Sequence, residues 1–178
     1  MKNVTFQGAP LTLSGNTLSV GDKLPSFKVT TNDLGEFTEK DSSGVRVFLA
    51  VPSIDTPVCD MEVKTFNKEI DSLEGVTCYT ISMDLPFAQG RWCALEGVEK
   101  VKTLSDYKDR SFAEATGTYI NEYFKLPYSL KRSFIIFLNA SSLFAALWII
   151  LFRARSIIFR ASSICVNSFV SKLKYFDI

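Results

Sequence analysis

Histidine is absent from this chain of 178 residues. Without it, the chain contains no Ser-His-Asp triad, no Cys-His pair and no histidine-based metal site. A reactive cysteine would therefore have to be activated by a helix end, by hydroxyl groups or by arginine and lysine side chains. The patterns G-x-G-x-x-G and G-x-x-x-x-G-K-[ST] are also missing, so the sequence supports neither of the common dinucleotide and phosphate loops.

The chain also has little net charge and no recognisable targeting signal. Its formal net charge is only +1, which indicates no nucleic-acid partner. The N-terminal residues MKNVTFQGAP lack the apolar core of a signal peptide. The four cysteines fit no zinc spacing, no C-x-x-C pair and no secreted disulfide framework: Cys59, Cys78, Cys93 and Cys165. We therefore expect a cytoplasmic protein with redox-active thiols, no metal and no cofactor.

The rest of the chain is organised around residues 45–66, VRVFLAVPSIDTPVCDMEVKTF. The apolar run that opens this segment predicts a strand buried on both faces, which Pro52 ends. Thr56 and Pro57 then mark a helix start, because a residue before proline avoids the helical region and proline is tolerated at the first helical position. Apolar residues at helical spacing continue the pattern: Val63, Phe66, Ile70 and Leu73.

Cys59 is the third residue of this predicted helix. Unpaired backbone N–H groups and the positive end of the helix dipole stabilise a thiolate at such a position. Cys59 is therefore a candidate nucleophile, and Thr56 is a candidate helix cap. The alternative for Cys59 is the inert packing that buried cysteines usually provide.

The remaining segments alternate between strand and helix patterns. In chain order they predict a hairpin at 4–13, strands at 26–31 and 76–82, a helix at 87–96, a strand at 101–104 and a brief helix at 111–120. Strands that alternate with helices indicate an α/β fold with crossover connections. Cys78 lies inside one of these strands, where we expect it to serve only in packing.

Cys93 lies in the predicted helix 87–96, 34 positions after Cys59. Both helices follow neighbouring predicted strands, so the two sulfur atoms could lie a modest distance apart. A bridge between them would constrain the unfolded chain by roughly 3–4 kcal/mol in the entropic description of disulfides. The alternative is a half-buried helix cysteine beside Trp92.

Several motifs resemble those of the bacterial thiol peroxidases, atypical 2-Cys members of the peroxiredoxin family. The motifs are PSIDTPVC (52–59), SMDLPFAQ (82–89), RWC (91–93), EG (96–97), VTFQGAPLTL (4–13) and GDKLPSF (21–27). The resemblance is strong over residues 3–122 and weaker up to residue 137. It implies a thioredoxin-like α/β fold with an N-terminal β-hairpin. The expected division is a hairpin at 1–17, a peroxiredoxin domain at 18–138 and an atypical tail at 139–178.

The resemblance implies reduction of hydrogen peroxide and organic hydroperoxides. Cys59 would attack the peroxide as a thiolate and become a sulfenic acid, which Cys93 would resolve as an intramolecular disulfide. Thr56 would hold the thiolate and orient the peroxide, Pro52 would shield the site from water, and Arg132 resembles an arginine on a later strand of the family. Capping the helix and binding the peroxide would compete for the one Thr56 hydroxyl. The alternative for Arg132 is an ordinary surface arginine with no role in the site.

The partners implied by the resemblance are a hydroperoxide, a thioredoxin-type reductant and a second copy of the chain. Two other functions compete with this one. A thiol-disulfide oxidoreductase normally has a C-x-x-C pair, which this chain lacks. A non-catalytic thioredoxin-like module, or an inactive product with a disrupted C-terminus, would use both cysteines for packing.

The C-terminal tail departs from the family. Residues 123–178 carry eight basic residues against one acidic residue, and no glycine follows Gly117. The uncharged run Ser133–Phe152 could cross a bilayer of about 30 Å at about 1.5 Å per residue, so a membrane anchor is one hypothesis. We favour another, that the tail was never selected for this fold, for instance because of a shifted reading frame. We then expect poorly formed last strands, no proper closing helix and an unstable or aggregating chain.

Overall fold

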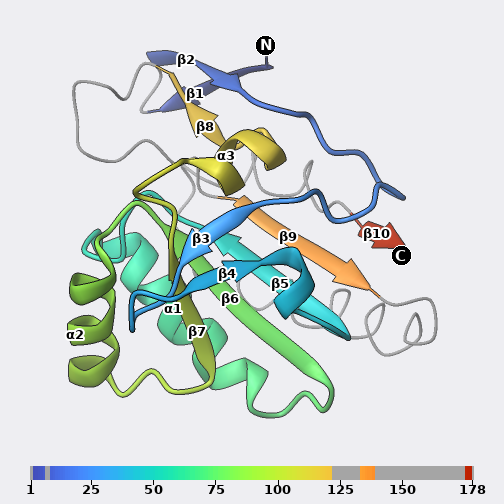
Figure 1. Ribbon diagram of the computed structural model, residues 1–178. Helices are drawn as coiled ribbons and strands as arrows, with labels where there is room; N and C mark the ends of the chain where they lie inside the picture. Colours follow the sequence, from blue (N-terminus) through green and yellow to red (C-terminus); the bar gives the residue numbers. More distant parts are fainter. Residues whose placement is uncertain (1, 7–8, 122–132, 139–174, 178) are drawn as a thin grey trace.

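The computed structural model describes residues 2–6, 9–121, 133–138 and 175–177 of the chain. Its centre is a mixed sheet of seven described strands (Figure 1). In spatial order they are β10 (Tyr175–Asp177), β9 (Ser133–Leu138), β5 (Val45–Ala50), β6 (Val76–Ser82), β7 (Val101–Ser105), β3 (Lys28–Thr30) and β4 (Glu36–Thr38). Strands β5, β6 and β7 are parallel, whereas β9 and β3 flank them in antiparallel orientation.

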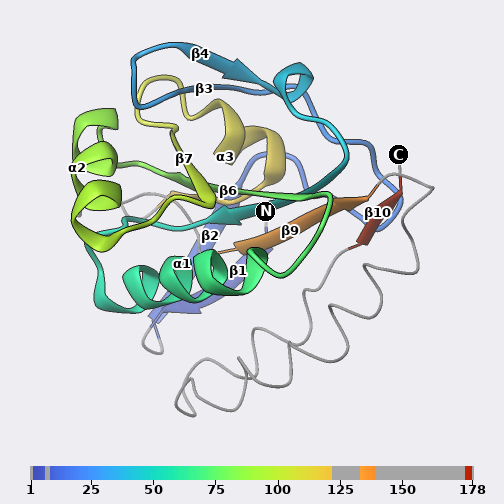
Figure 2. The same cartoon turned by 90° about the horizontal axis from the view of Figure 1, so that it is seen from below.

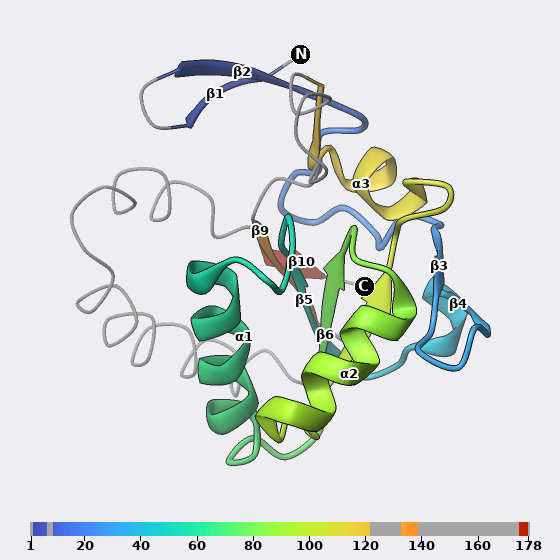
Figure 3. The ribbon, with the colours of Figure 1, turned by 90° about the vertical axis from the view of Figure 1, so that its left-hand side faces the viewer.

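The parallel strands are joined by two crossover helices. Helix α1 (Pro57–Ile70) connects β5 to β6, and helix α2 (Pro86–Glu96) connects β6 to β7. Each helix has a proline at its first position, which suits a helix start because that residue needs no N–H partner. Helix α2 ends at Gly97, whose left-handed backbone with φ of 63° closes the helix. In Figure 3, α1 lies to the left of β5, and α2 passes obliquely in front of β6.

Both faces of the sheet are buried, as predicted for β5. Val47, Leu49 and Val51 face a buried cluster that includes Val63 of α1 and Trp92 of α2. The alternate residues of β5 face a second cluster, which includes side chains of helix α3 (Ser111–Thr116). Helices α1 and α3 therefore cover opposite faces of the sheet (Figure 2). The two cysteine-bearing helices lie on the same face.

A second sheet joins the N-terminal hairpin to the body of the protein. Strands β1 (Lys2–Phe6) and β2 (Ala9–Ser14) form the hairpin, and β2 pairs with β8 (Tyr119–Ile120). The connection after β2 packs closely on α3, where Asn16 N–H donates to the Glu114 carbonyl at 2.8 Å. A Cβ atom at Gly15 would lie 2.2 Å from that same carbonyl oxygen, and one at Gly117 would lie 2.3 Å from the Asn16 carbonyl oxygen. Both positions therefore require glycine.

The α/β fold with an N-terminal hairpin is confirmed, and most predicted elements occur within a few residues of their expected bounds. Four short elements differ from the sequence prediction: β4, the 3-10 helix η1 (Glu39–Asp41), β8 and β10. Strand β8 lies where the sequence predicts the end of a helix. Elements of two or three residues are too short to show the repeating pattern of apolar residues that identifies a helix or a strand.

The tail differs in part from expectation. Residues 133–138 form strand β9, which pairs with β5, so this late strand is present where poorly formed strands were expected. The expected closing-helix region and most of the uncharged run fall in 139–174, outside the described residues. Within the part of the chain that the structure describes, no helix is long and apolar enough to cross a membrane.

Candidate active site

Cys59 lies in the first turn of α1, as the sequence predicted. Thr56 precedes the helix with extended backbone geometry, and its carbonyl accepts the Asp60 N–H at 2.9 Å. The Cys59 side chain is only 4% exposed and belongs to the buried cluster between α1, α2 and the sheet. A sulfur placed there meets the positive end of the helix dipole in a setting that excludes bulk water.

Thr56 is the N-cap residue of α1, as predicted, but its hydroxyl makes no hydrogen bond that caps the helix. It donates instead to the Ser53 carbonyl at 3.1 Å, within the loop that joins β5 to α1. This bond turns the hydroxyl toward the loop interior. Because the backbone alone starts the helix, the hydroxyl is not committed to a capping bond.

The loop before Cys59 is held by a buried carboxylate, Asp84, at the end of β6. Its Oδ1 accepts the Ser53 hydroxyl at 2.6 Å, and its Oδ2 accepts the Ile54 N–H at 2.8 Å. Ser82 also donates to Oδ2 at 2.6 Å. These contacts extend to Gln89, whose Nε2 donates to the Ser82 hydroxyl at 2.8 Å. The network joins the loop that precedes Cys59 to the first turns of α2.

Cys93 lies in the last turn of α2 and packs at the edge of the cluster that contains Cys59. Its sulfur lies 3.4 Å from the Thr103 hydroxyl on β7. Burial raises the pKa of the Cys93 thiol, although the hydrogen bond with Thr103 partly opposes this effect. Cys59 and Cys93 are both thiols in this structure and are not joined.

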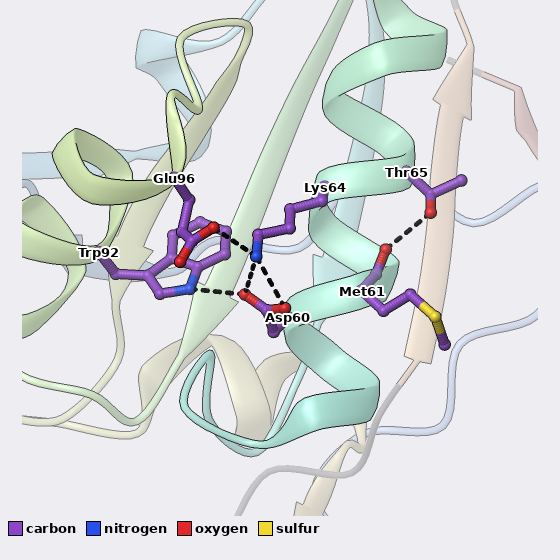
Figure 4. Close-up of polar contacts among 6 residues, drawn as sticks. All are labelled: Asp60, Met61, Lys64, Thr65, Trp92 and Glu96. Carbon is purple, nitrogen blue, oxygen red and sulfur yellow. Dashed lines mark hydrogen bonds and ion pairs between the residues drawn. The ribbon is translucent and has the colours of Figure 1, made fainter.

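Four side chains, which we call the interhelical clasp, join α1 to α2 beside the cysteines: Asp60, Lys64, Trp92 and Glu96 (Figure 4). The Trp92 indole N–H donates to Asp60 Oδ1 at 2.9 Å. Lys64 Nζ lies 2.9 Å from Asp60 Oδ1 and 2.5 Å from Glu96 Oε2. The hydrogen bond with Glu96, followed by that with Asp60, raises the pKa of Lys64. The clasp therefore fixes the two helices against each other at their cysteine-bearing turns.

The structure describes only some of the other residues singled out from the sequence. Cys78 is fully buried in β6, and burial raises its thiol pKa far above the ordinary range, so the packing role expected for it is confirmed. Pro52 lies in the same loop as Thr56 and is half-buried. Arg132 and Cys165 lie outside the described residues. No group of three or more potential metal ligands occurs in residues 2–6, 9–121, 133–138 and 175–177.

Sequence reasoning missed Asp84 and the clasp as parts of this site. A signal for Asp84 was present, because it closely follows β6, and parallel strands end at one edge of the sheet. The clasp carried a weaker signal, since Asp60 directly follows Cys59 and Trp92 directly precedes Cys93. Sequence alone could not place those two side chains against each other.

Comparisons with known proteins agree with this geometry. The sequence model of the AhpC/TSA family matches residues 20–139. A thiol peroxidase of Clostridium acetobutylicum is 56% identical over 119 residues, which are 67% of this chain and 73% of that protein. A thiol peroxidase of Bacillus subtilis is 51% identical over 123 residues, 68% of this chain and 74% of that protein. The chain belongs to the AhpC/TSA family.

Solved structures show the AhpC/TSA fold directly. A peroxiredoxin-like protein from Aquifex aeolicus superposes with a TM-score of 0.69 at 38% identity, over 77% of this chain and 80% of that one. A thiol peroxidase from Chromobacterium violaceum superposes with a TM-score of 0.64 at 22% identity, over 71% and 74% of the two chains. The expected thioredoxin-like fold and the resemblance to bacterial thiol peroxidases are thus confirmed.

Proposed function

We propose that this protein is a thiol-dependent peroxidase in which Cys59 reacts with the peroxide and Cys93 resolves the product. The observation that carries the proposal is the position of Cys59, buried in the first turn of α1 within the cluster that Cys93 borders. The Cys59 thiolate attacks one peroxide oxygen, the O–O bond breaks, and the alcohol or water leaves after taking a proton. Cys59 is then a sulfenic acid.

Resolution closes the cycle. The Cys93 sulfur attacks the Cys59 sulfenic acid, an S–S bond forms as the S–O bond breaks, and the hydroxide leaves with the thiol proton as water. A thioredoxin-type dithiol then reduces the disulfide. In this proposal Thr56 orients the peroxide through its hydroxyl, Pro52 limits water at the site, and Arg132 supplies positive charge. The family membership supports these roles, as does the Thr56 hydroxyl that makes no capping bond.

We further propose a homodimer in the cytoplasm. Large apolar side chains are exposed near the starts of both cysteine-bearing helices: Val58, Met61, Leu85 and Phe87. Exposed large apolar side chains are a common feature of protein interfaces. A second copy of the chain would cover some of these side chains, and light scattering after size exclusion would give the mass of the assembly.

The test compares two cysteine variants in a peroxide-consumption assay, with a disulfide-reduction assay run beside it. Cys59→Ser should abolish turnover, because the nucleophile is lost. Cys93→Ser should still allow a single peroxide reaction per chain, because only resolution is lost. Mass spectrometry of the oxidised wild type should show a peptide that links Cys59 to Cys93. Full multiple turnover in Cys59→Ser would refute the proposed mechanism.

A further inference from the structure

We propose that the interhelical clasp is a latch that limits the rate at which the Cys59 sulfenic acid becomes a disulfide, with Asp60 and Trp92 as its positioning residues. The inference rests on the proposed function, since it concerns the step that follows peroxide reduction. It proposes that the clasp residues, which contact neither sulfur in the proposed chemistry, limit the rate of disulfide formation.

The clasp residues are sequence neighbours of the two cysteines. Asp60 follows Cys59 in the first turn of α1, and Trp92 precedes Cys93 in the last turns of α2. Adjacent helical residues share a peptide unit, so neither cysteine backbone can shift without moving its clasp neighbour. The bond from Trp92 to Asp60 therefore resists displacement of both cysteine backbones together.

In this proposal, joining the sulfurs displaces the backbone at both cysteines. Cys93 is directed to the Thr103 hydroxyl on β7, and this contact must be broken before its sulfur reaches Cys59. A disulfide also needs Cα atoms about 4.4–6.8 Å apart and a defined torsion about the S–S bond. The cysteines lie at opposite ends of their helices, in the first turn of α1 and the last turn of α2. Local unwinding at these helix ends breaks the clasp.

The hydrogen bond from Trp92 to Asp60 is the strongest part of the clasp. The Trp92 side chain is only 7% exposed, and its N–H donates to a carboxylate, so an unmade bond would leave a buried donor without a partner. The ion pairs of Lys64 are more exposed, with side chains 28–39% accessible, and solvent weakens them. Trp92 and Asp60 should therefore dominate the effect.

A slow latch lengthens the life of the sulfenic acid. A second peroxide molecule can then oxidise it to the sulfinic acid, which leaves the cycle. The clasp would thus set the ratio of resolution to overoxidation at a given peroxide concentration. Loosening the clasp should protect the enzyme against excess peroxide.

The primary test is Trp92→Phe, which keeps an aromatic ring but removes the N–H donor. Peroxide is mixed with reduced protein, the reaction is quenched by alkylation at successive times, and mass spectrometry follows sulfenic acid and disulfide separately. The loss of one hydrogen bond predicts disulfide formation faster by about 3- to 10-fold, with less sulfinic acid at high peroxide. Unchanged or slower disulfide formation would overturn the proposal.

A double-mutant cycle separates the clasp from general loosening by the smaller ring. Asp60→Ala should also accelerate resolution, and the double variant Asp60→Ala/Trp92→Phe should be little faster than either single variant, since both remove the same bond. Additive effects would instead show two independent disturbances and overturn the proposal.

Thr65→Val is the matched control, because it removes the 2.7 Å bond to the Met61 carbonyl on the side of α1 away from α2 (Figure 4). An acceleration equal to that of Trp92→Phe would overturn the proposal as well.

The same experiment distinguishes failure of the latch from failure of the proposed function. A wild-type protein that consumes peroxide and forms the Cys59–Cys93 disulfide upholds the function whatever the clasp variants do. If the wild type forms no such disulfide, the proposed function fails and this inference fails with it.

Discussion

At the scale of single residues, the Thr56 hydroxyl is the most direct test of how the site handles its substrate. Thr56→Val keeps the shape of the side chain but removes the hydroxyl that now donates to the Ser53 carbonyl. If that hydroxyl orients the peroxide, the rate constant for sulfenic acid formation should fall by roughly 10- to 100-fold, as expected for one charge-assisted hydrogen bond. The measurement is stopped-flow kinetics in a Cys93→Ser background. Thr56→Ser should retain most of the rate, and a Thr56→Val rate equal to wild type would exclude the role.

The sequence identified Cys59 from local signals alone, because a proline after the N-cap and the position in the first turn are read within four residues. It left open the hydrogen bond of the Thr56 hydroxyl, which has more than one possible partner. The three-dimensional geometry of the loop determines which partner the hydroxyl bonds, and the sequence alone does not reveal that geometry.

At the scale of elements, Asp84 should decide how firmly the loop before Cys59 is held on the sheet. Asp84→Asn places an amide where the carboxylate accepts from Ser53, Ile54 and Ser82, so at least one buried donor loses its acceptor. The free energy of unfolding should fall by about 1–3 kcal/mol. Urea denaturation measures this directly, and limited proteolysis should show faster cleavage within residues 51–58.

Asp71→Asn is the matched control for this prediction. It makes the same chemical change at an exposed carboxylate, which lies 2.8 Å from Lys100 Nζ at the far end of α1. Exposed ion pairs contribute little, so the free energy of unfolding should change far less than in Asp84→Asn. Equal losses for the two variants would refute the role assigned to Asp84.

The long elements were predictable because each repeats its pattern several times. Helix α1 carries three of the four apolar residues expected at helical spacing, Val63, Phe66 and Ile70, and β6 was expected at the residues it occupies, 76–82. The position of Asp84 after β6 was a usable signal, but its hydrogen-bond partners were not predictable, since the network joins the ends of separate strands. Such contacts depend on how the strands are ordered in the sheet, which no single segment encodes.

At the scale of the whole molecule, a buried carboxyl makes stability depend on pH. Burial raises the pKa of Asp106 from 3.8 to about 7, against the opposing effect of the N–H groups of Ala113 and Phe112. The folded state therefore holds this proton more tightly than the unfolded state. The stability it contributes is fully present below pH 3.8 and is lost as the pH rises through about 7.

The slope of this loss should approach about 1.4 kcal/mol per pH unit between the two values, because one proton is released on unfolding. Urea unfolding of wild type and Asp106→Asn at several pH values from 5 to 8 would measure it. The difference between the two proteins should shrink as the pH rises, since the amide does not titrate. A constant difference across this range would show that Asp106 does not titrate there.

The two glycines where the hairpin connection meets α3 carry a consequence for how this protein could change over generations. The backbone approaches so closely that any side chain at Gly15 would collide with the Glu114 carbonyl, and any at Gly117 with the Asn16 carbonyl. Gly15, in the connection after the hairpin, thus allows the close approach of α3, and Gly117, after α3, allows the close approach of the hairpin connection. The hairpin could not be transplanted alone onto a related domain, because a recipient with a larger residue at the position of Gly117 would reject it. The first seventeen residues and the turn after α3 can only be inherited as a pair.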